Sequence, residues 1–346
     1  MKKIIVFTIC IALVAMLFGC GESKPTLKVY NAGEYIDTAL ISDFEAENNC
    51  KVIYETFDSN ESMYTKVMSG ESYDVIIPSD YMIERLAKEG FLSEIDKSKL
   101  QNYDKIMPSI LSQPFDPENK YSIPYFWGSV GILYDETQVD AKDLEAGWDI
   151  LKNPKYKGNI YMYDSERDSF MIALKALGCS LNTSDKKELD AAYNWLIEQN
   201  EIMSPVYVGD EVIDSMISGN KAMAIVYSGD AAYIMSENEN MKYFEPEVGT
   251  NLWIDGMVVM KDSQSAELAY KFIDFMISPE NALKNSEMVG YTSPVESVFE
   301  KLRETTYAGN EAYVPRQGFE RDEFFRYQDA ETKKYCAELW TKVKSQ

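Results

Sequence analysis

The sequence contains no histidine in its 346 residues, and this absence excludes several kinds of site. A Ser-His-Asp triad, a Cys-His dyad and a zinc site with histidine ligands all require an imidazole side chain. Any general acid or base in this protein would therefore have to be Asp, Glu, Lys, Tyr or Cys.

Basic residues and cysteines are also scarce. The chain has 34 Lys and Arg against 57 Asp and Glu, a formal net charge of −23, which argues against nucleic acid as a partner because phosphate contacts need basic side chains. The cysteines form no CxxC pair, so we predict no metal site, no redox motif and no cofactor. A disulfide among Cys50, Cys179 and Cys336 is not indicated.

Apolar runs of membrane-spanning length are lacking at the N-terminus. Residues 4–18 are apolar, but a bilayer span needs about 20 residues, so this run suits the core of a signal peptide. The remaining composition, 45% hydrophobic and 26% charged, is typical of a folded globular protein, and the length favours two domains.

The apolar run ends in Leu17-Phe18-Gly19-Cys20, which resembles a bacterial lipobox, although Phe18 is larger than the residue usual at that position. We therefore predict a lipoprotein signal peptide at 1–19, lipidation of Cys20 and a short tether at 20–25. The protein would be exported and lipid-anchored at the cell membrane, facing the periplasm or the cell exterior, since two acyl chains give stable anchoring. The alternative is an uncleaved anchor helix with a chance cysteine.

The chain after the tether alternates strand and helix patterns. Residues 26–31, 51–56 and 73–77 read as strands, and each is followed by a helical pattern, which predicts an α/β fold with a parallel sheet. Asn60 and Asp80 are the expected caps of two of these helices. Further along, we expect strands at 130–134 and 221–226 and helices at 186–199, 266–277 (ending before Pro279) and 319–344.

Several collinear segments resemble the spermidine/putrescine-binding proteins of bacterial ABC uptake transporters. They are VYNAGEYID (29–37), FDSNESMYTKV (57–67), YDVIIPSDYMIERL (73–86), IDKSKL (95–100), PFDPENKYSIPYFWGSVGI (114–132), NPKYKGN (153–159), RDSFMIALKALG (167–178), LWIDGMVV (252–259) and VGYTSPV (289–295). They run in order over nearly the whole mature chain.

This resemblance implies a two-lobed periplasmic-binding-protein fold (type II-like) with the ligand in the cleft between the lobes. It implies a first lobe from 26–133 plus 255–299 and a second from 134–254 plus 300–346. The expected function is capture of a polyamine, spermidine or putrescine, for a membrane permease. The protein would be a monomer and not an enzyme.

The resemblance also implies the ligand-binding residues. These are Glu34, Tyr35, Ser79, Tyr81, Asp164, Ser165, Asp168, Tyr227, Trp253, Asp255, Tyr291 and Gln328. Carboxylates would neutralise the ammonium groups, and aromatic faces would cover methylenes and attract the cations. A solvated face is the alternative for Asp164 and Glu166, a turn cap for Asp255, and Arg326 competes with Gln328.

Two departures from the family pattern concern the aromatic walls of the site. Ala32 and Gly33 stand where the family commonly has an aromatic and a hydroxyl residue, and Tyr227 stands where it usually has tryptophan. These changes leave open a different cationic or polar solute as the ligand. A glycosidase with paired carboxylates is a further alternative from another functional class.

Overall fold

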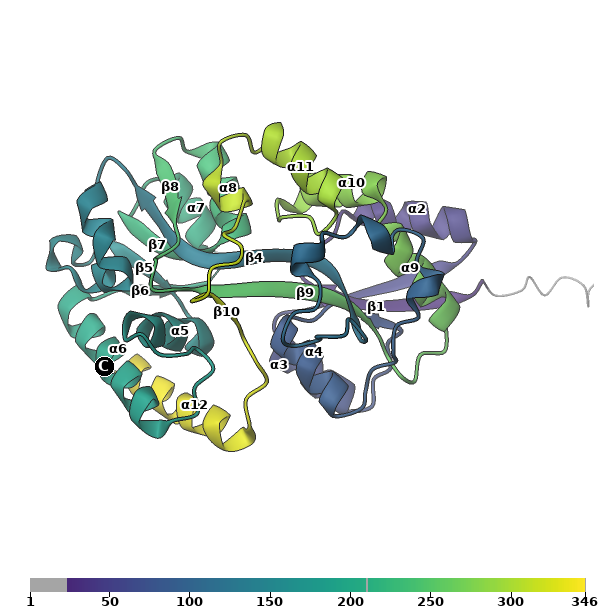
Figure 1. The fold of residues 1–346 in the computed structure, drawn as a ribbon, viewed down its shortest axis with the longest axis horizontal. Helices are drawn as coiled ribbons and strands as arrows, with labels where there is room; N and C mark the ends of the chain where they lie inside the picture. The colour runs from purple at the N-terminus through teal and green to yellow at the C-terminus, as the bar shows by residue number, and fades with distance from the viewer. Residues whose placement is uncertain (1–23, 210, 346) are drawn as a thin grey trace, which may run out of the picture.

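A computed structural model describes residues 24–209 and 211–345. The predicted signal peptide and Cys20 lie outside the described residues. In the described part of the chain, helices surround a mixed sheet of ten strands (Figure 1). The strands are β1 (Thr26–Ala32), β2 (Lys51–Phe57), β3 (Val75–Ile76), β4 (Ser122–Asp135), β5 (Ile160–Tyr163), β6 (Val206–Val208), β7 (Met223–Tyr227), β8 (Met241–Phe244), β9 (Asn251–Val259) and β10 (Glu323–Phe324).

The helices lie on both sides of this sheet. They are α2 (Thr38–Asn48), α3 (Asn60–Met68), α4 (Asp80–Lys88), α5 (Glu166–Ala176), α6 (Lys186–Met203), α7 (Val212–Ile217), α8 (Ser228–Glu237), α9 (Ala266–Met276), α10 (Pro279–Val289), α11 (Glu296–Glu304) and α12 (Ala330–Lys344). Short 3-10 helices span Lys97–Lys99, Tyr103–Lys105, Pro108–Ile110, Ala141–Lys152, Pro154–Tyr156 and Glu311–Tyr313.

The sheet has the strand order β2-β1-β3-β9-β4-β7-β5-β6, with β10 added to β9 and β8 to β4. Strand β1 pairs in parallel with β2 and β3, as the strand–helix alternation predicts. Strand β9 is antiparallel to β3 and β4, so the sheet is mixed rather than purely parallel. The α/β fold class is confirmed.

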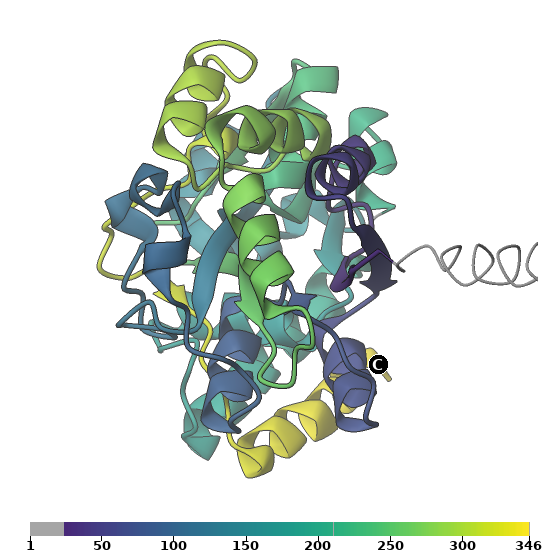
Figure 2. The same ribbon diagram turned by 90° about the vertical axis from the view of Figure 1, so that its right-hand side faces the viewer.

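Two long strands, β4 and β9, connect the halves of the molecule (Figure 1). Residues 122–129 of β4 pair with β9, and residues 130–134 pair with β7, so the predicted lobe boundary at 133/134 falls within β4. We call the half with β1–β3, α2–α4 and α9 the first lobe, and the half with β5–β8, α5–α8 and α12 the second lobe. Figure 2 looks onto the first lobe, with α9 in front of the sheet and α12 along the lower side.

Asn60, the predicted cap of α3, instead holds the loop that precedes α4. The cap is Ser59, one residue earlier than predicted, because its hydroxyl accepts the Ser62 N–H at 3.1 Å and the reciprocal bond is also formed. Asn60 instead bonds to Ser79, through the Ser79 hydroxyl at 3.0 Å and the Ser79 N–H at 3.1 Å. Ser79 precedes α4, and Asp80 is the first residue of the helix rather than its cap.

The C-terminal segment differs from the predicted helix at 319–344. Glu323 and Phe324 pair with β9 as a parallel strand, and α12 begins at Ala330. Asp329 caps this helix by accepting the N–H groups of Glu331 and Thr332, both at 2.9 Å. The strand pairing and this cap shorten the helix.

A buried carboxylate in α4 anchors the segment between β10 and α12. Glu84 accepts Arg326 Nη2 at 2.7 Å, Arg326 Nε at 2.9 Å and the Tyr327 N–H at 2.8 Å. Burial raises the pKa of Glu84, but the hydrogen bonds from Arg326 and Lys88 outweigh it and lower the pKa to about 2. The ionised carboxylate therefore holds this segment against the first lobe.

Replacing Glu84 by glutamine should lower the free energy of unfolding by about 2 kcal/mol near neutral pH, because Arg326 loses its buried counter-ion. Because the pKa of Glu84 is lower in the folded than in the unfolded protein, its ionised carboxylate stabilises the fold at pH values above the unfolded pKa of 4.5. This stabilisation is lost as the pH falls from 4.5 toward 2. The difference from wild type in urea unfolding should therefore shrink over that interval. The exposed Glu304, changed to glutamine, is the control, and equal stability of both variants would contradict the assignment.

Candidate functional site

Strand β9 carries two of the predicted residues at the junction of the lobes. Trp253 and Asp255 are two positions apart, so both side chains lie on one face of the sheet. The indole N–H of Trp253 donates to the Ser129 carbonyl at 3.2 Å, and Asp255 Oδ2 accepts the Tyr35 hydroxyl at 2.7 Å. Asp255 also forms an isolated antiparallel bridge with Ser79. The structure thus brings four predicted residues together.

The second lobe contributes a matching group at the carboxyl ends of β5 and β7. The Tyr227 hydroxyl donates to Asp168 Oδ2 at 2.9 Å, and the Tyr163 hydroxyl donates to Asp230 Oδ2 at 2.8 Å. The rings of Tyr163 and Tyr227 lie 4.9 Å apart between centroids. Asp168 and Asp230 each stand in the first turn of a helix, α5 and α8, where a carboxylate is favoured.

Tyr291 links the two groups. Its hydroxyl donates to Asp230 Oδ1 at 2.7 Å, and its ring centroid lies 5.5 Å from those of both Tyr35 and Trp253, edge to face. Trp253 in turn lies 6.2 Å from Tyr227. The result is a continuous row of aromatic rings from the first lobe to the second, with a carboxylate near each end and one between.

The carboxyl groups of the site are poorly solvated. Burial raises the pKa of Asp255, although hydrogen bonds from Ser79 and Tyr35 oppose it. Burial also raises the pKa of Asp168, against hydrogen bonds from Ser165 and Tyr227. Asp80 is buried beside this group, and burial raises its pKa well above the usual range. A cation placed among these groups would favour their ionised forms.

Other predicted residues lie apart from this group or have other roles. Asp164 is exposed and its Oδ1 is 2.8 Å from Lys344 Nζ, which is an ion pair on the outer surface of the second lobe. Ser165 caps α5 by accepting the Asp168 N–H at 3.3 Å. Glu34 is exposed on a turn with φ of 50° and forms no hydrogen bond or ion pair with the described residues.

Two further predicted residues, Tyr81 and Gln328, lie in helix α4 and in the segment between β10 and α12. The Tyr81 hydroxyl donates to Glu61 at 3.3 Å, and its ring faces the Arg167 guanidinium at 3.6 Å. Gln328 is half-buried in the C-terminal segment, and the competing Arg326 is paired with Glu84.

Sequence reasoning missed Asp230 and Tyr163. Asp230 follows the buried strand β7 and stands in the first turn of the next helix, the same position relative to a strand that singled out residues 79–81. Tyr163 is the last residue of β5. The rule that ligands bind at the carboxyl ends of parallel strands would have identified both.

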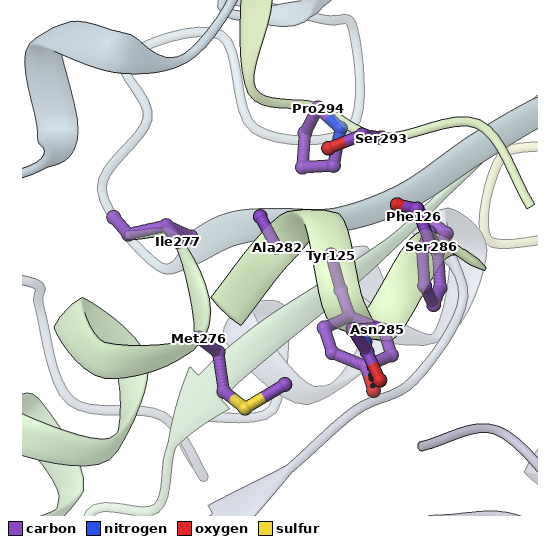
Figure 3. A pocket seen from close by; sticks show the side chains of 9 residues that line it. All are labelled: Tyr125, Phe126, Met276, Ile277, Ala282, Asn285, Ser286, Ser293 and Pro294. Carbon is purple, nitrogen blue, oxygen red and sulfur yellow. Dashed lines mark hydrogen bonds between the residues drawn. The ribbon is translucent and has the colours of Figure 1, made fainter. Parts of the chain in front are cut away.

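A small cavity lies behind the site, between β4 and α10 (Figure 3). Its volume of about 10 Å³ has room for one water molecule at most, so it is not a ligand pocket. Beside it, Asn285 Nδ2 donates to the Tyr125 hydroxyl at 3.0 Å, and that hydroxyl donates to the Tyr35 carbonyl at 2.6 Å. Asn285 Oδ1 also accepts the Asp37 N–H at 2.9 Å. Helix α10 thereby supports the loop that carries Tyr35.

Comparison with known proteins gives one consistent family. The model of the family described as bacterial extracellular solute-binding protein matches residues 39–312. The spermidine/putrescine-binding periplasmic protein of Escherichia coli strain K12 is 36% identical over 278 residues, which are 79% of each chain. The putrescine-binding periplasmic protein SpuD of Pseudomonas aeruginosa is 28% identical over 350 residues, 96% of this chain and 95% of that protein.

A solved structure agrees with these relatives. The spermidine/putrescine ABC transporter substrate-binding protein PotD from Streptococcus pneumoniae superposes with a TM-score of 0.81 and 39% identity, covering 93% of this chain and 99% of that one. These relatives are substrate-binding proteins of transport systems and not enzymes, which confirms the prediction of a non-catalytic protein and removes the glycosidase alternative.

Proposed function

Because the chain belongs to the bacterial extracellular solute-binding proteins, we propose that it captures a polyamine of the spermidine and putrescine class and delivers it to the permease of an ABC transporter. One observation carries this proposal. Asp255, Asp230 and Asp168 are hydrogen-bonded to tyrosine hydroxyls along a row of aromatic rings that spans the two lobes.

This arrangement suits a flexible chain of methylenes with ammonium groups at intervals. A tyrosine hydroxyl is a neutral donor, so an ammonium that replaces it at a carboxylate forms a stronger, charge-assisted hydrogen bond. Each cation–π contact adds about 0.5–2 kcal/mol. A micromolar complex needs roughly −8 kcal/mol, which a few such contacts and two or three charge pairs can supply.

A second candidate is another cationic or polar solute, favoured by the small residues Ala32 and Gly33 next to Glu34. A Cβ added at Gly33 would meet nothing within 4 Å, so the space beside Gly33 is open. Calorimetry against putrescine, spermidine, spermine and a neutral sugar separates the candidates. Micromolar binding of at least one polyamine, with no heat from the sugar, supports the proposal, and failure of all three polyamines overturns it.

We further propose that the two lobes close on the ligand by a hinge at β4 and β9. A ligand shifts this equilibrium only by its differential affinity for the open and closed forms. A polyamine that contacts both Asp255 and Asp168 has a higher affinity for the closed form, because the open form leaves one of these contacts unmade. Small-angle scattering should therefore show a smaller radius of gyration at saturating polyamine than without it.

The raised pKa values of Asp255 and Asp168 predict how binding depends on pH. Polyamine amines stay charged well above neutral pH, like lysine. A carboxyl that is protonated in the free site must lose its proton to pair with an ammonium, so binding releases protons. Affinity should rise with pH from about 4 up to the raised pKa values, and calorimetry in two buffers of different ionisation enthalpy should report net proton release. Proton uptake would contradict this prediction.

The lipid anchor is part of the proposal. No helix among residues 24–209 and 211–345 is long and apolar enough to cross a membrane. We propose that Cys20, after the lipobox, carries the acyl chains and that the binding domain works as a monomer outside the cytoplasm. Changing Cys20 to alanine should release or mislocalise the protein, and unaltered detergent-sensitive membrane retention would contradict lipidation.

A further inference from the structure

A cluster of charged side chains connects the lobes beside the proposed ligand site. Glu61 belongs to α3 of the first lobe, and its Oε1 lies 3.5 Å from Arg167 Nη2 of α5 and 3.2 Å from Lys333 Nζ of α12. Both cations belong to the second lobe. Figure 2 shows α12 along the same lower side of the molecule as α3 and α4.

The same cluster reaches a predicted ligand residue, Tyr81. The Tyr81 hydroxyl donates to the second oxygen of Glu61 at 3.3 Å, and the Arg167 guanidinium covers the ring of Tyr81 at 3.6 Å. Arg167 is one-quarter exposed, so this contact is partly shielded from water. Glu61 thus holds a first-lobe aromatic ring and a second-lobe cation together.

The charges of this cluster are complementary across the lobe junction. Burial raises the pKa of Glu61, but Lys333 and Arg167 outweigh it, so the pKa lies below its ordinary value and the carboxylate is ionised. Glu166 of α5 also faces the cluster, and its pKa is raised by burial. Opening the lobes would separate Glu61 from both of its cations, whereas ion pairs within one lobe, such as Glu55 with Lys66, would persist.

We propose that Glu61 is a positioning residue, a latch that draws Arg167 and Lys333 onto the first lobe and so favours the closed arrangement of the lobes. It acts through Tyr81 and Arg167 and does not itself contact the ligand. This inference deepens the proposed binding function. The affinity tests below rest on that function, whereas the scattering test without ligand does not. The latch makes closure sensitive to salt, because the Debye length falls from about 8 Å at physiological salt to about 3 Å at 1 M.

The test compares Glu61→Gln with the matched control Glu55→Gln, whose partner Lys66 at 2.6 Å is on the same lobe. Partly exposed ion pairs are worth up to about 1 kcal/mol each, so Glu61→Gln should weaken putrescine and spermidine binding about threefold to tenfold at low salt. That difference should vanish near 1 M salt. The control should bind like wild type, and both variants should keep the wild-type melting temperature within a few degrees.

A double-mutant cycle tests whether Glu61 acts through its second-lobe cation. Lys333→Gln alone should weaken binding, but it should have little further effect in the Glu61→Gln background, because that ion pair is already broken there. Fully additive effects of the two substitutions, or Glu61→Gln with wild-type affinity at low salt, would overturn the proposal.

Scattering without ligand tests the latch even if no polyamine binds. Unliganded Glu61→Gln should have a larger radius of gyration than the unliganded wild type and Glu55→Gln. Failure of polyamine binding in all proteins would overturn the proposed function, whereas equal radii in all three unliganded proteins would overturn the latch. The two failures are therefore separate results.

Discussion

Replacing Asp255 by asparagine is expected to weaken polyamine binding at least about thirtyfold, which corresponds to about 2 kcal/mol. Asp255 lies on β9, receives the Tyr35 hydroxyl at 2.7 Å and is poorly solvated, so its charge is weakly screened. An asparagine of nearly the same shape keeps the hydrogen bond from Tyr35 but leaves an ammonium unpaired. Truncating one partner of a buried charge pair is costly mainly for that reason.

The stability of the same variant provides an independent check. Because burial raises the pKa of Asp255, the ionised carboxylate destabilises the unliganded fold near neutral pH. Asp255→Asn should therefore melt at or slightly above the wild-type temperature while it loses affinity. The exposed Asp262, changed to asparagine, is the control for charge alone. Wild-type affinity of Asp255→Asn in calorimetry would remove Asp255 from the proposed site.

The first half of the fold can be predicted from the sequence because each strand and helix has a recognisable local pattern. Strands β1 to β3 have alternating or continuous apolar residues, and each is followed by a helix start and an apolar periodicity. Strand β4 was predicted only at residues 130–134, although it begins at Ser122. Pro124 reads as a strand breaker, and the structure places it beside a shift in the pairing of β4 with β9, where proline is tolerated.

Helix α10 shows how one residue can carry two signals. In the sequence, Pro279 predicts the end of the preceding helix, and α9 ends at Met276. The structure also uses Pro279 at the start of α10, where its missing N–H costs nothing. This helix supplies Asn285, which supports the Tyr35 loop, so the support of the site was missed together with the helix.

The residues of the site differ in the kind of information that is needed to predict them. Asp255, Tyr35 and Asp168 were identified through a family resemblance, and the structure places them in one aromatic and acidic group. Asp164, four residues before Asp168, is exposed and pairs with Lys344 at the end of α12, whereas Asp168 is buried in the first turn of α5. The partners of Asp230 lie 61 and 67 residues away, a relation that local patterns do not contain.

Replacing Gly229 by alanine is expected to damage both the stability and the binding of the protein. Gly229 is the second residue of α8, and a Cβ built there would lie 2.0 Å from Tyr291 Cδ1 and 2.1 Å from Cε1. The Tyr291 ring must then move, which breaks its hydrogen bond to Asp230 and its edge contact with Trp253. Overpacking of this kind costs about 1–3 kcal/mol, and polyamine affinity should fall at least about tenfold.

A double-mutant cycle shows whether the Tyr291 ring is the cause. In a Tyr291→Ala background the added methyl group has free space, so Gly229→Ala should lose most of its effect on the free energy of unfolding. Tyr291→Phe keeps the ring and removes only the hydroxyl, so it should weaken binding through Asp230 while the steric penalty of Gly229→Ala persists in its presence. Urea unfolding measures the stabilities and calorimetry the affinities. An equal penalty for Gly229→Ala with and without the Tyr291 ring would mean that the close approach of α8 to Tyr291 does not shape this site.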